Sequence, residues 1–183
     1  MTTQPNNRMI LRSSPESENE SLLTVKAFLK ENYPGFNMIL EKNDSVWKAL
    51  AGVDKEGFTI FAPNAGALVA LGESKKQQLL DPRNLETTQK VGAYHVIAET
   101  VTAEQLFNAG GVVTLGGTVA VERSRTGGFM GVGGKEDGGV TINGAKVVRT
   151  TALGNGLVHE VDGLVSPNIL WRYMDQLRIP GSR

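Results

Sequence analysis

The two histidines are the residues of this chain best suited to acid–base or metal chemistry. His95 and His159 are the only histidines among 183 residues, and the chain has no cysteine. Neither histidine has a second histidine or a carboxylate cluster at the spacings that zinc sites use. Asp162 follows His159 by three residues, and on a strand two residues three apart point to opposite faces. We therefore expect both histidines to be hydrogen-bonded structural residues, not catalytic bases or metal ligands.

A glycine-rich stretch superficially resembles a phosphate-binding loop. It reads Gly-Phe-Met-Gly-Val-Gly-Gly-Lys-Glu from Gly128 to Glu136. A phosphate loop needs Ser or Thr after its lysine to bind magnesium, whereas Glu136 stands there and would repel phosphate. No serine lies in a nucleophile-elbow pattern. The sequence therefore predicts no enzyme, no cofactor and no metal site.

The same stretch carries apolar side chains that could contact a partner. Phe129, Met130 and Val132 lie within a long loop expected from Arg123 to Gly139, where the glycines make the backbone costly to order. One interpretation is an elongated hairpin connection whose tip folds these side chains back onto the domain. The other is a contact finger for a protein partner or an apolar ligand.

The C-terminal stretch allows the same two interpretations. Asn168 to Ile179 is predicted to be an amphipathic helix, within a C-terminal helix and tail of residues 168–183. Trp171, Tyr173 and Met174 are residue types enriched in interface cores, and they are equally suited to close the core of a small domain.

Composition excludes several classes of partner and location. Lys plus Arg and Asp plus Glu both number 19, so no net field attracts nucleic acid or an acidic membrane face. The sequence contains no apolar run of about 18 residues that could span a membrane. Residues 1–21 are polar, without the apolar core of a signal peptide, and we expect a mobile leader there. The compartment stays open between a protein that is not exported and a processed extracytoplasmic or plastid form.

Short strands and turns are expected to hold these candidate residues. Phe58 to Ala62 is rich in aromatic and β-branched residues and stops at Pro63, which predicts a buried strand. Residues 94–97 are a second strand candidate. The pairs Gly116-Gly117 and Asn143-Gly144 each predict a hairpin.

Short helices are expected around the first strand. Residues 22–32 show one apolar face, and Ser45 is predicted to cap a helix that contains Val46 and Trp47. Thr102 and Gln105 have the spacing of a capping box and predict another short helix.

Three stretches in order resemble the signatures of the fasciclin domain. The residues that match the first signature, Thr-Val-Phe-Ala-Pro-Thr-Asn-x-Ala-Phe, are Thr59, Ile60, Phe61, Ala62, Pro63 and Ala67. Those that match the second, Asn-Gly-x-Ile-His-x-Ile-Asp-x-Val-Leu-x-Pro, are Asn155, Gly156, His159, Asp162 and Pro167. Tyr94 and His95 match the Tyr-His pair that lies between the two signatures.

The resemblance implies a fold and a role. It implies an α+β domain over residues 22–167, with a wedge-shaped, mainly antiparallel β assembly and several packed short helices. Fasciclin domains are generally non-enzymatic modules for protein–protein contact, often in cell adhesion or matrix, or accessory parts of larger complexes. In some animal members the Tyr-His region is implicated in receptor contact, which nominates Tyr94 and His95.

Two hypotheses follow for this chain. The first is an assembly module that docks a protein through its C-terminal helix, the Phe129–Val132 tip, or both. The second is a binding module for a lipid, pigment or other apolar molecule, which would use space near Thr88 and Gly92. There the family usually has leucines, so the smaller residues predict either close packing or a small hollow.

Overall fold

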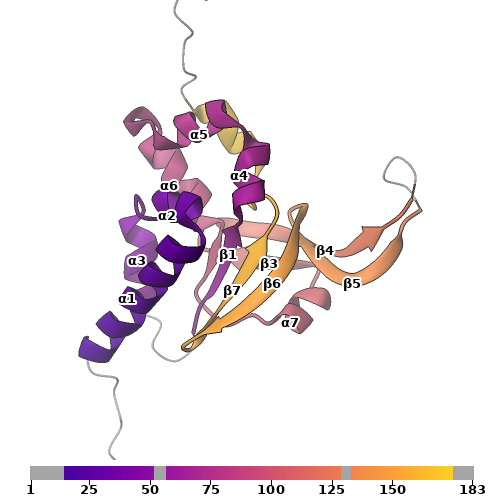
Figure 1. Cartoon of the computed structure of the whole chain (residues 1–183), viewed down its shortest axis with the longest axis horizontal. Helices are drawn as coiled ribbons and strands as arrows, with labels where there is room; N and C mark the ends of the chain where they lie inside the picture. Colours follow the sequence, from indigo (N-terminus) through magenta and orange to yellow (C-terminus); the bar gives the residue numbers. More distant parts are fainter. Residues whose placement is uncertain (1–14, 52–56, 129–132, 175–183) are drawn as a thin grey trace, which may run out of the picture.

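The structure is a computed structural model that describes residues 15–51, 57–128 and 133–174. Helices gather on one side of the molecule, and a twisted sheet forms the other side (Figure 1). The α-helices before the second strand are α1 (Pro15–Asn32), α2 (Pro34–Leu40), α3 (Asp44–Ala51), α4 (Ala65–Leu71), α5 (Glu73–Leu80) and α6 (Leu85–Ala93). The 3-10 turn η1 (Pro82–Asn84) lies between α5 and α6. The remaining helical elements are α7 (Ala103–Phe107) and η2 (Asn168–Tyr173).

The sheet contains seven strands in the order β2-β1-β7-β6-β5-β4-β3. Their bounds are β1 (Thr59–Pro63), β2 (Val96–Ile97), β3 (Gly111–Thr114), β4 (Gly117–Thr126), β5 (Lys135–Ile142), β6 (Ala145–Leu153) and β7 (Gly156–Val161). All neighbours are antiparallel except β1 and β7, which run parallel. The amide of Leu115 donates to Val96 O at 2.8 Å, so the two ends of the sheet meet. This arrangement confirms the predicted α+β class with a mainly antiparallel β assembly.

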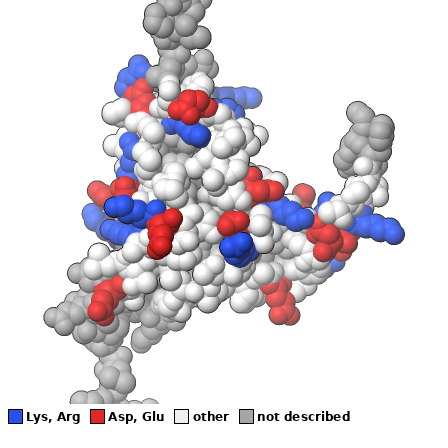
Figure 2. Space-filling view, viewed as in Figure 1, with Lys and Arg blue, Asp and Glu red and all other residues white. Residues whose placement is uncertain are grey.

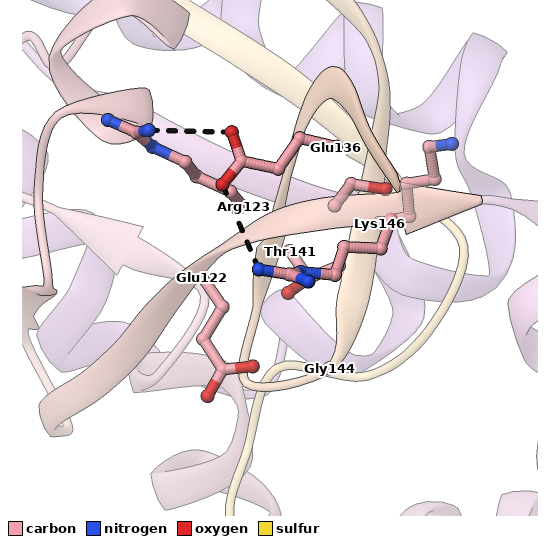
Figure 3. Close-up of a pocket in the computed structure, with 8 residues that line it drawn as sticks. Glu122, Arg123, Glu136, Thr141, Gly144 and Lys146 are labelled. Atoms are coloured by element: carbon pink, nitrogen blue, oxygen red, sulfur yellow. Dashed lines mark hydrogen bonds and ion pairs between the residues drawn. The ribbon is translucent and has the colours of Figure 1, made fainter. Parts of the chain in front are cut away.

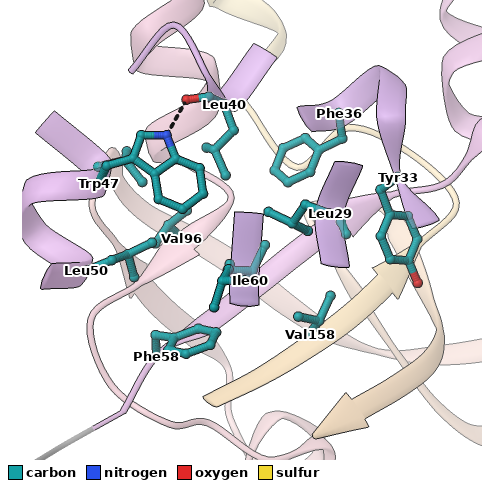
Figure 4. Close-up of a cluster of buried hydrophobic side chains, with 13 residues drawn as sticks. Leu29, Tyr33, Phe36, Leu40, Trp47, Leu50, Phe58, Ile60, Val96 and Val158 are labelled. Carbon is teal, nitrogen blue, oxygen red and sulfur yellow. Dashed lines mark hydrogen bonds between the residues drawn. The ribbon is translucent and has the colours of Figure 1, made fainter. Parts of the chain in front are cut away.

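The strand β1 separates two apolar cores, because its side chains alternate between its faces. Ile60 faces the helices α1 to α3, where it packs with Leu29 and Val158 (Figure 4). Phe61 faces the other way and packs with Val161 in a second core. All of these side chains are buried, so the segment predicted to be a buried strand lies at the centre of the molecule.

Polar groups at the ends of elements fix how the helices meet the sheet. Asn64 caps α4, since its Oδ1 accepts from the amide of Ala67 at 2.8 Å. The hydroxyl of Tyr33 donates to Glu160 Oε1 at 3.0 Å and ties the start of α2 to β7. Burial and this hydrogen bond raise the pKa of Tyr33 to about 12, so the hydroxyl stays a donor.

The hairpin predicted at Asn143-Gly144 is confirmed, and its geometry explains the residue types. Asn143 and Gly144 have φ of 48° and 86°, the left-handed values that a tight β-turn of this kind requires. The side-chain amide of Asn143 also donates to Val165 O at 2.8 Å. The turn therefore joins β5 to β6 and holds the segment after β7.

Two helix starts differ from the sequence-based expectation. Helix α1 begins at Pro15, so residues 15–21 are helical although they were expected in a mobile leader; proline is favoured at a first helical position. Asn43, not Ser45, caps α3, because its Oδ1 accepts from both the Val46 amide at 3.1 Å and the Ser45 hydroxyl.

Two later elements also differ. Most of the loop expected from Arg123 to Gly139 is strand, because β4 continues to Thr126 and β5 begins at Lys135, with Arg125 opposite Glu136. In place of a helix over residues 168–179, the structure has the 3-10 helix η2 over residues 168–173, with a Leu170 to Pro167 bond of 3.2 Å. Residues 175–179 lie outside the described residues.

Candidate interaction surfaces

His95 is a structural residue, as the sequence predicts. Its side chain is fully buried, and its Nδ1 lies 2.7 Å from Val91 O while its Nε2 accepts from the Val165 amide at 3.0 Å. A carbonyl can only accept, so Nδ1 carries the proton and the ring is neutral. Burial lowers the pKa of His95 from 6.5 to about 4, and the bond to Val91 only partly opposes this. His95 therefore joins α6 to the segment after β7.

His159 is also a structural residue, but its proton lies on the other ring nitrogen, Nε2. Its Nε2 donates to Val101 O at 2.8 Å, and its Nδ1 lies 2.7 Å from the Thr150 hydroxyl. Burial lowers the pKa of His159 as well. Asp162 does not pair with it, because Asp162 Oδ1 accepts from the Lys146 amide at 2.7 Å. The expectation that the two residues form no catalytic pair is confirmed.

The Tyr-His pair is not a free contact surface in this chain. His95 has no exposed surface, so its nomination as a partner contact is corrected. Tyr94 is half-buried, with its ring against Gly116 and Gly117, where a Cβ on Gly116 would lie 2.7 Å from a ring carbon. The imidazole is buried against Phe36, with 5.3 Å between ring centres, which leaves none of its surface for a receptor.

The space near Thr88 and Gly92 is filled by packing. Thr88 is fully buried, and its hydroxyl donates to Leu79 O at 2.9 Å. A Cβ on Gly92 would meet the side chains of Leu40 and Asn43 at 3.5 and 3.6 Å, so the small residue lets α2 approach α6 closely. Of the two readings of these small residues, the structure therefore supports close packing.

A small apolar depression lies beside this region, between α2, α4 and α5. Its lining includes Met38, Leu68 and Leu79, and it encloses about 70 Å³. Sites for lipid- or pigment-sized ligands enclose roughly 300–1,000 Å³. The depression is therefore too small for the lipid or pigment of the second hypothesis.

The most prominent surface feature is a two-stranded ribbon that projects from the body. We call it the β4–β5 arm and define it as residues 122–126 of β4 and 135–140 of β5. In Figure 1 the arm extends away from the helices α1 to α6 and from the rest of the sheet, while α7 lies beside its base. The strand β6 pairs with β5 only at Thr141 and Ile142 and then turns to pair with β7. Within the described ranges, the outer half of the arm therefore has no further strand beside it.

The base of the arm holds an open, charged hollow of about 720 Å³ (Figure 3). Its lining includes Glu122, Arg123, Arg125, Glu136, Thr141 and Lys146. Figure 2 shows side chains of both signs gathered where the arm leaves the body. The predicted contact residues Phe129, Met130 and Val132 belong to the tip of this arm, but they lie outside the described residues, so their role stays a prediction.

The C-terminal candidates divide between core and surface. Met174 is buried with Ile39 and Val91 in a third apolar core. Trp171 is half-buried and lies under the ammonium of Lys75, which is 5.2 Å from its ring centre. By contrast, Tyr173 is 71 % exposed. Of the three predicted residues, Tyr173 alone presents most of its side chain to solvent, so Met174 is corrected to a core residue.

Sequence reasoning missed the charged residues of the arm, although a signal was present. Val119 and Val121 are two residues apart and buried in the second core. Arg123 and Arg125 follow at the same two-residue spacing but are exposed, whereas Ser124 between them is buried, so the burial pattern of the body changes where the arm begins. The interruption of an apolar alternation by arginine marks the residue at which the strand leaves the core.

Other kinds of site are not found in the part of the chain that the structure describes. No three His, Asp or Glu side chains there come together as metal ligands would. None of the helices in the described ranges has the length and hydropathy needed to cross a bilayer.

Comparison with known proteins agrees with this geometry. The Fasciclin domain family model matches residues 31–167. Protein sll1483 of Synechocystis sp. (strain ATCC 27184 / PCC 6803 / Kazusa) is 31 % identical over 111 residues, which cover 60 % of this chain and 55 % of that protein. The chain thus spans about half the length of this curated relative.

A solved structure shows the same fold. It contains a FAS1 domain pair from the insect cell adhesion molecule Fasciclin I, and it matches with a TM-score of 0.50 at 20 % identity. The match covers 71 % of this chain and 43 % of the solved chain. Both signatures and the Tyr-His pair lie within the matched residues 31–167, in the central strands and at the imidazole contacts described above. The chain therefore belongs to the fasciclin domain family.

Proposed function

We propose that this protein is a non-enzymatic module that binds a protein partner through the β4–β5 arm. One observation carries the proposal: two strands continue beyond the body with no neighbouring strand in the described ranges, and of the arm residues only Ser124 and Val140 are buried. An isolated two-stranded ribbon is only marginally stable in water. A second surface that covers the ribbon would stabilise it, and loops held away from a rigid scaffold commonly carry recognition.

Family membership supports an interaction role in general but names no partner. The solved relative is a cell adhesion molecule, and adhesion by this chain would be one form of the proposed activity. The histidines support a non-enzymatic role, because both rings are neutral and fully engaged by backbone or hydroxyl groups. A general base needs a free lone pair within reach of substrate.

The proposal is tested by affinity capture from the native source with an arm-shortened variant. Residues 124–139 are replaced by a four-residue glycine-rich turn between Arg123 and Val140, which face each other across the two strands. We expect the captured partner, identified by mass spectrometry and then purified, to bind the wild type and to lose at least tenfold in affinity for the variant. Circular dichroism and thermal unfolding report whether the body still folds.

A matched variant separates the two predicted docking surfaces. Tyr173→Ala removes the exposed C-terminal aromatic ring without touching the arm. Unchanged partner affinity for the arm-shortened variant, together with loss for Tyr173→Ala, would move the binding surface to the C-terminal segment and refute the role of the arm.

A further inference from the structure

The inner face of the arm, defined as the side that holds Arg123 and Arg125, is basic, and Arg123 on it contacts Phe107 of α7. Val119 and Val121 of β4 are each 4 % exposed, whereas Arg123 and Arg125, which follow at the same spacing, lie in the exposed part of the strand. Their side chains are 47 % and 60 % exposed. Both arginines line the open hollow at the base of the arm.

The carboxylate of Glu136 lies near both arginines. Glu136 Oε2 lies 3.4 Å from Arg123 Nη1, and Glu136 Oε1 lies 4.0 Å from Arg125 Nη2. These distances are longer than those of a tight charge-assisted pair, which is about 2.7–2.9 Å. The guanidinium of Arg123 also stacks over Phe107, with 4.4 Å to the ring centre. Its Nε also donates to Phe107 O at 3.4 Å, so both contacts hold the group in place beside Glu136.

The neighbouring acidic residue cannot neutralise the second arginine. Asp137 already accepts from Lys146 Nζ at 2.9 Å, from the Ser124 hydroxyl at 3.0 Å and from the Gly139 amide at 2.9 Å. The bond from Lys146 is the main cause that lowers the pKa of Asp137. Of the carboxylates near the two arginines, Glu136 is therefore the one that pairs with them, and it does so at long distances, while Glu122 also lines the hollow.

We propose that Arg123 and Arg125 receive an Asp- or Glu-bearing segment of the protein partner in this hollow. The inference rests on the proposed function and specifies the chemistry of the partner. Arginine forks match carboxylates in geometry, and the hollow of about 720 Å³ accommodates several side chains. Glu122 and Glu136 line the same hollow, which disfavours the closely spaced charges of a polyphosphate and favours carboxylates on flexible side chains, which can lie opposite the arginines.

The test uses an acidic peptide on the full chain. Acetylated, amidated hexaglutamate is titrated into ¹⁵N-labelled protein at low salt, with hexalysine and the oligonucleotide dT6 as alternative probes. We expect hexaglutamate to shift the amide resonances of residues 122–126 and 135–141, and to do so less at high salt because exposed charges are screened. Hexalysine and dT6 should leave these resonances in place.

Matched variants assign the effect to the arginines. R123Q/R125Q should weaken hexaglutamate binding at least tenfold, whereas K30Q/K48Q, which removes the same charge from exposed residues of α1 and α3, should not. The exposed pairs add little to stability, so both variants should fold with similar unfolding temperatures. Equal binding of hexaglutamate to wild type and R123Q/R125Q would overturn the inference, as would stronger binding of dT6 at the arm.

The outcome is distinguishable from failure of the proposed function. If the arm-shortened variant loses its partner while R123Q/R125Q retains it, the arm is the binding surface but the acidic segment is not its ligand. If both variants retain the partner, the proposed function fails as well.

Discussion

At the scale of single residues, the two histidines act as fixed links between distant parts of the chain. His95 bonds Val91 and Val165, and His159 bonds Val101 and Thr150. The residue type and apolar surroundings in the sequence were enough to predict their structural role. The bonded atoms could not be predicted, because they come from segments up to 70 residues away that only the folded chain brings together.

The buried imidazoles make stability depend on pH. An unfolded His95 takes up a proton near pH 6.5, whereas the folded pKa is about 4, so the unfolded state binds more protons between these values. The contribution to stability is complete above pH 6.5 and is lost as the pH falls toward 4. We expect the free energy of unfolding to fall by about 2 kcal/mol from His95 alone between pH 7.5 and pH 5, measured by urea unfolding.

Ring ¹⁵N chemical shifts provide the direct control. At pH 5 the folded protein should still show His95 protonated at Nδ1 alone. An imidazolium signal for His95 in the folded state at that pH would contradict the pH prediction.

Position 156 requires glycine because the Phe58 ring lies close to its Cα, not because of its backbone conformation. A Cβ at Gly156 would overlap the ring of Phe58, whereas a Cβ at Gly110 would have no atom within 4 Å. We expect Gly156→Ala to lower the free energy of unfolding by about 1–3 kcal/mol, as overpacked cores do. Gly110→Ala should change it by less than about 0.5 kcal/mol. Equal small effects in chemical denaturation would show that Phe58 moves aside freely.

At the scale of elements, local signals predicted turns well and strand lengths less well. The hairpin at Asn143-Gly144 follows from residues that tolerate left-handed φ. The stretch from Arg123 to Gly139 was expected to be a loop because it is polar and rich in glycine. Pairing of Arg125 with Glu136 across the ribbon keeps it extended, and such cross-strand pairing cannot be read from composition.

The cap of α3 gives a test at this scale. Asn43 is buried, and besides capping Val46 it donates to Gln89 O at 2.6 Å. Asn43→Ala leaves buried polar groups without partners, so we expect it to cost about 2–3 kcal/mol of the free energy of unfolding. Ser45→Ala removes a single contact to Asn43 and should cost less than about 1 kcal/mol. A larger loss for Ser45→Ala would restore Ser45 as the principal cap.

At the scale of the whole molecule, the first and last strands of the domain lie side by side. Residues Thr59–Pro63 of β1 pair in parallel with Leu157–Val161 of β7, so both fasciclin signatures meet in the centre. The resemblance predicted the α+β class. The pairing of β1 with β7 joins segments about a hundred residues apart, and for it the sequence carries no local signal.

Helix α1 packs on the rest of the domain, although the family match begins near its end, at residue 31. Leu29 is fully buried in the first core, whereas Leu23 on the same helix is 63 % exposed. We expect Leu29→Ala to lower the free energy of unfolding by about 2–5 kcal/mol through lost burial and a cavity. Leu23→Ala should lower it by less than about 0.5 kcal/mol. Similar values for both would show that α1 is not packed on the sheet.

The central claim is that recognition occurs on the β4–β5 arm while the body serves as a rigid scaffold. Hydrogen–deuterium exchange of the full chain, alone and with its purified partner, tests this claim most directly. We predict slower exchange on binding in residues 122–126 and 135–140, with the amides of β1 and β7 unchanged. Unchanged exchange in the arm, with slower exchange confined to the helices or to residues 168–174, would contradict the account.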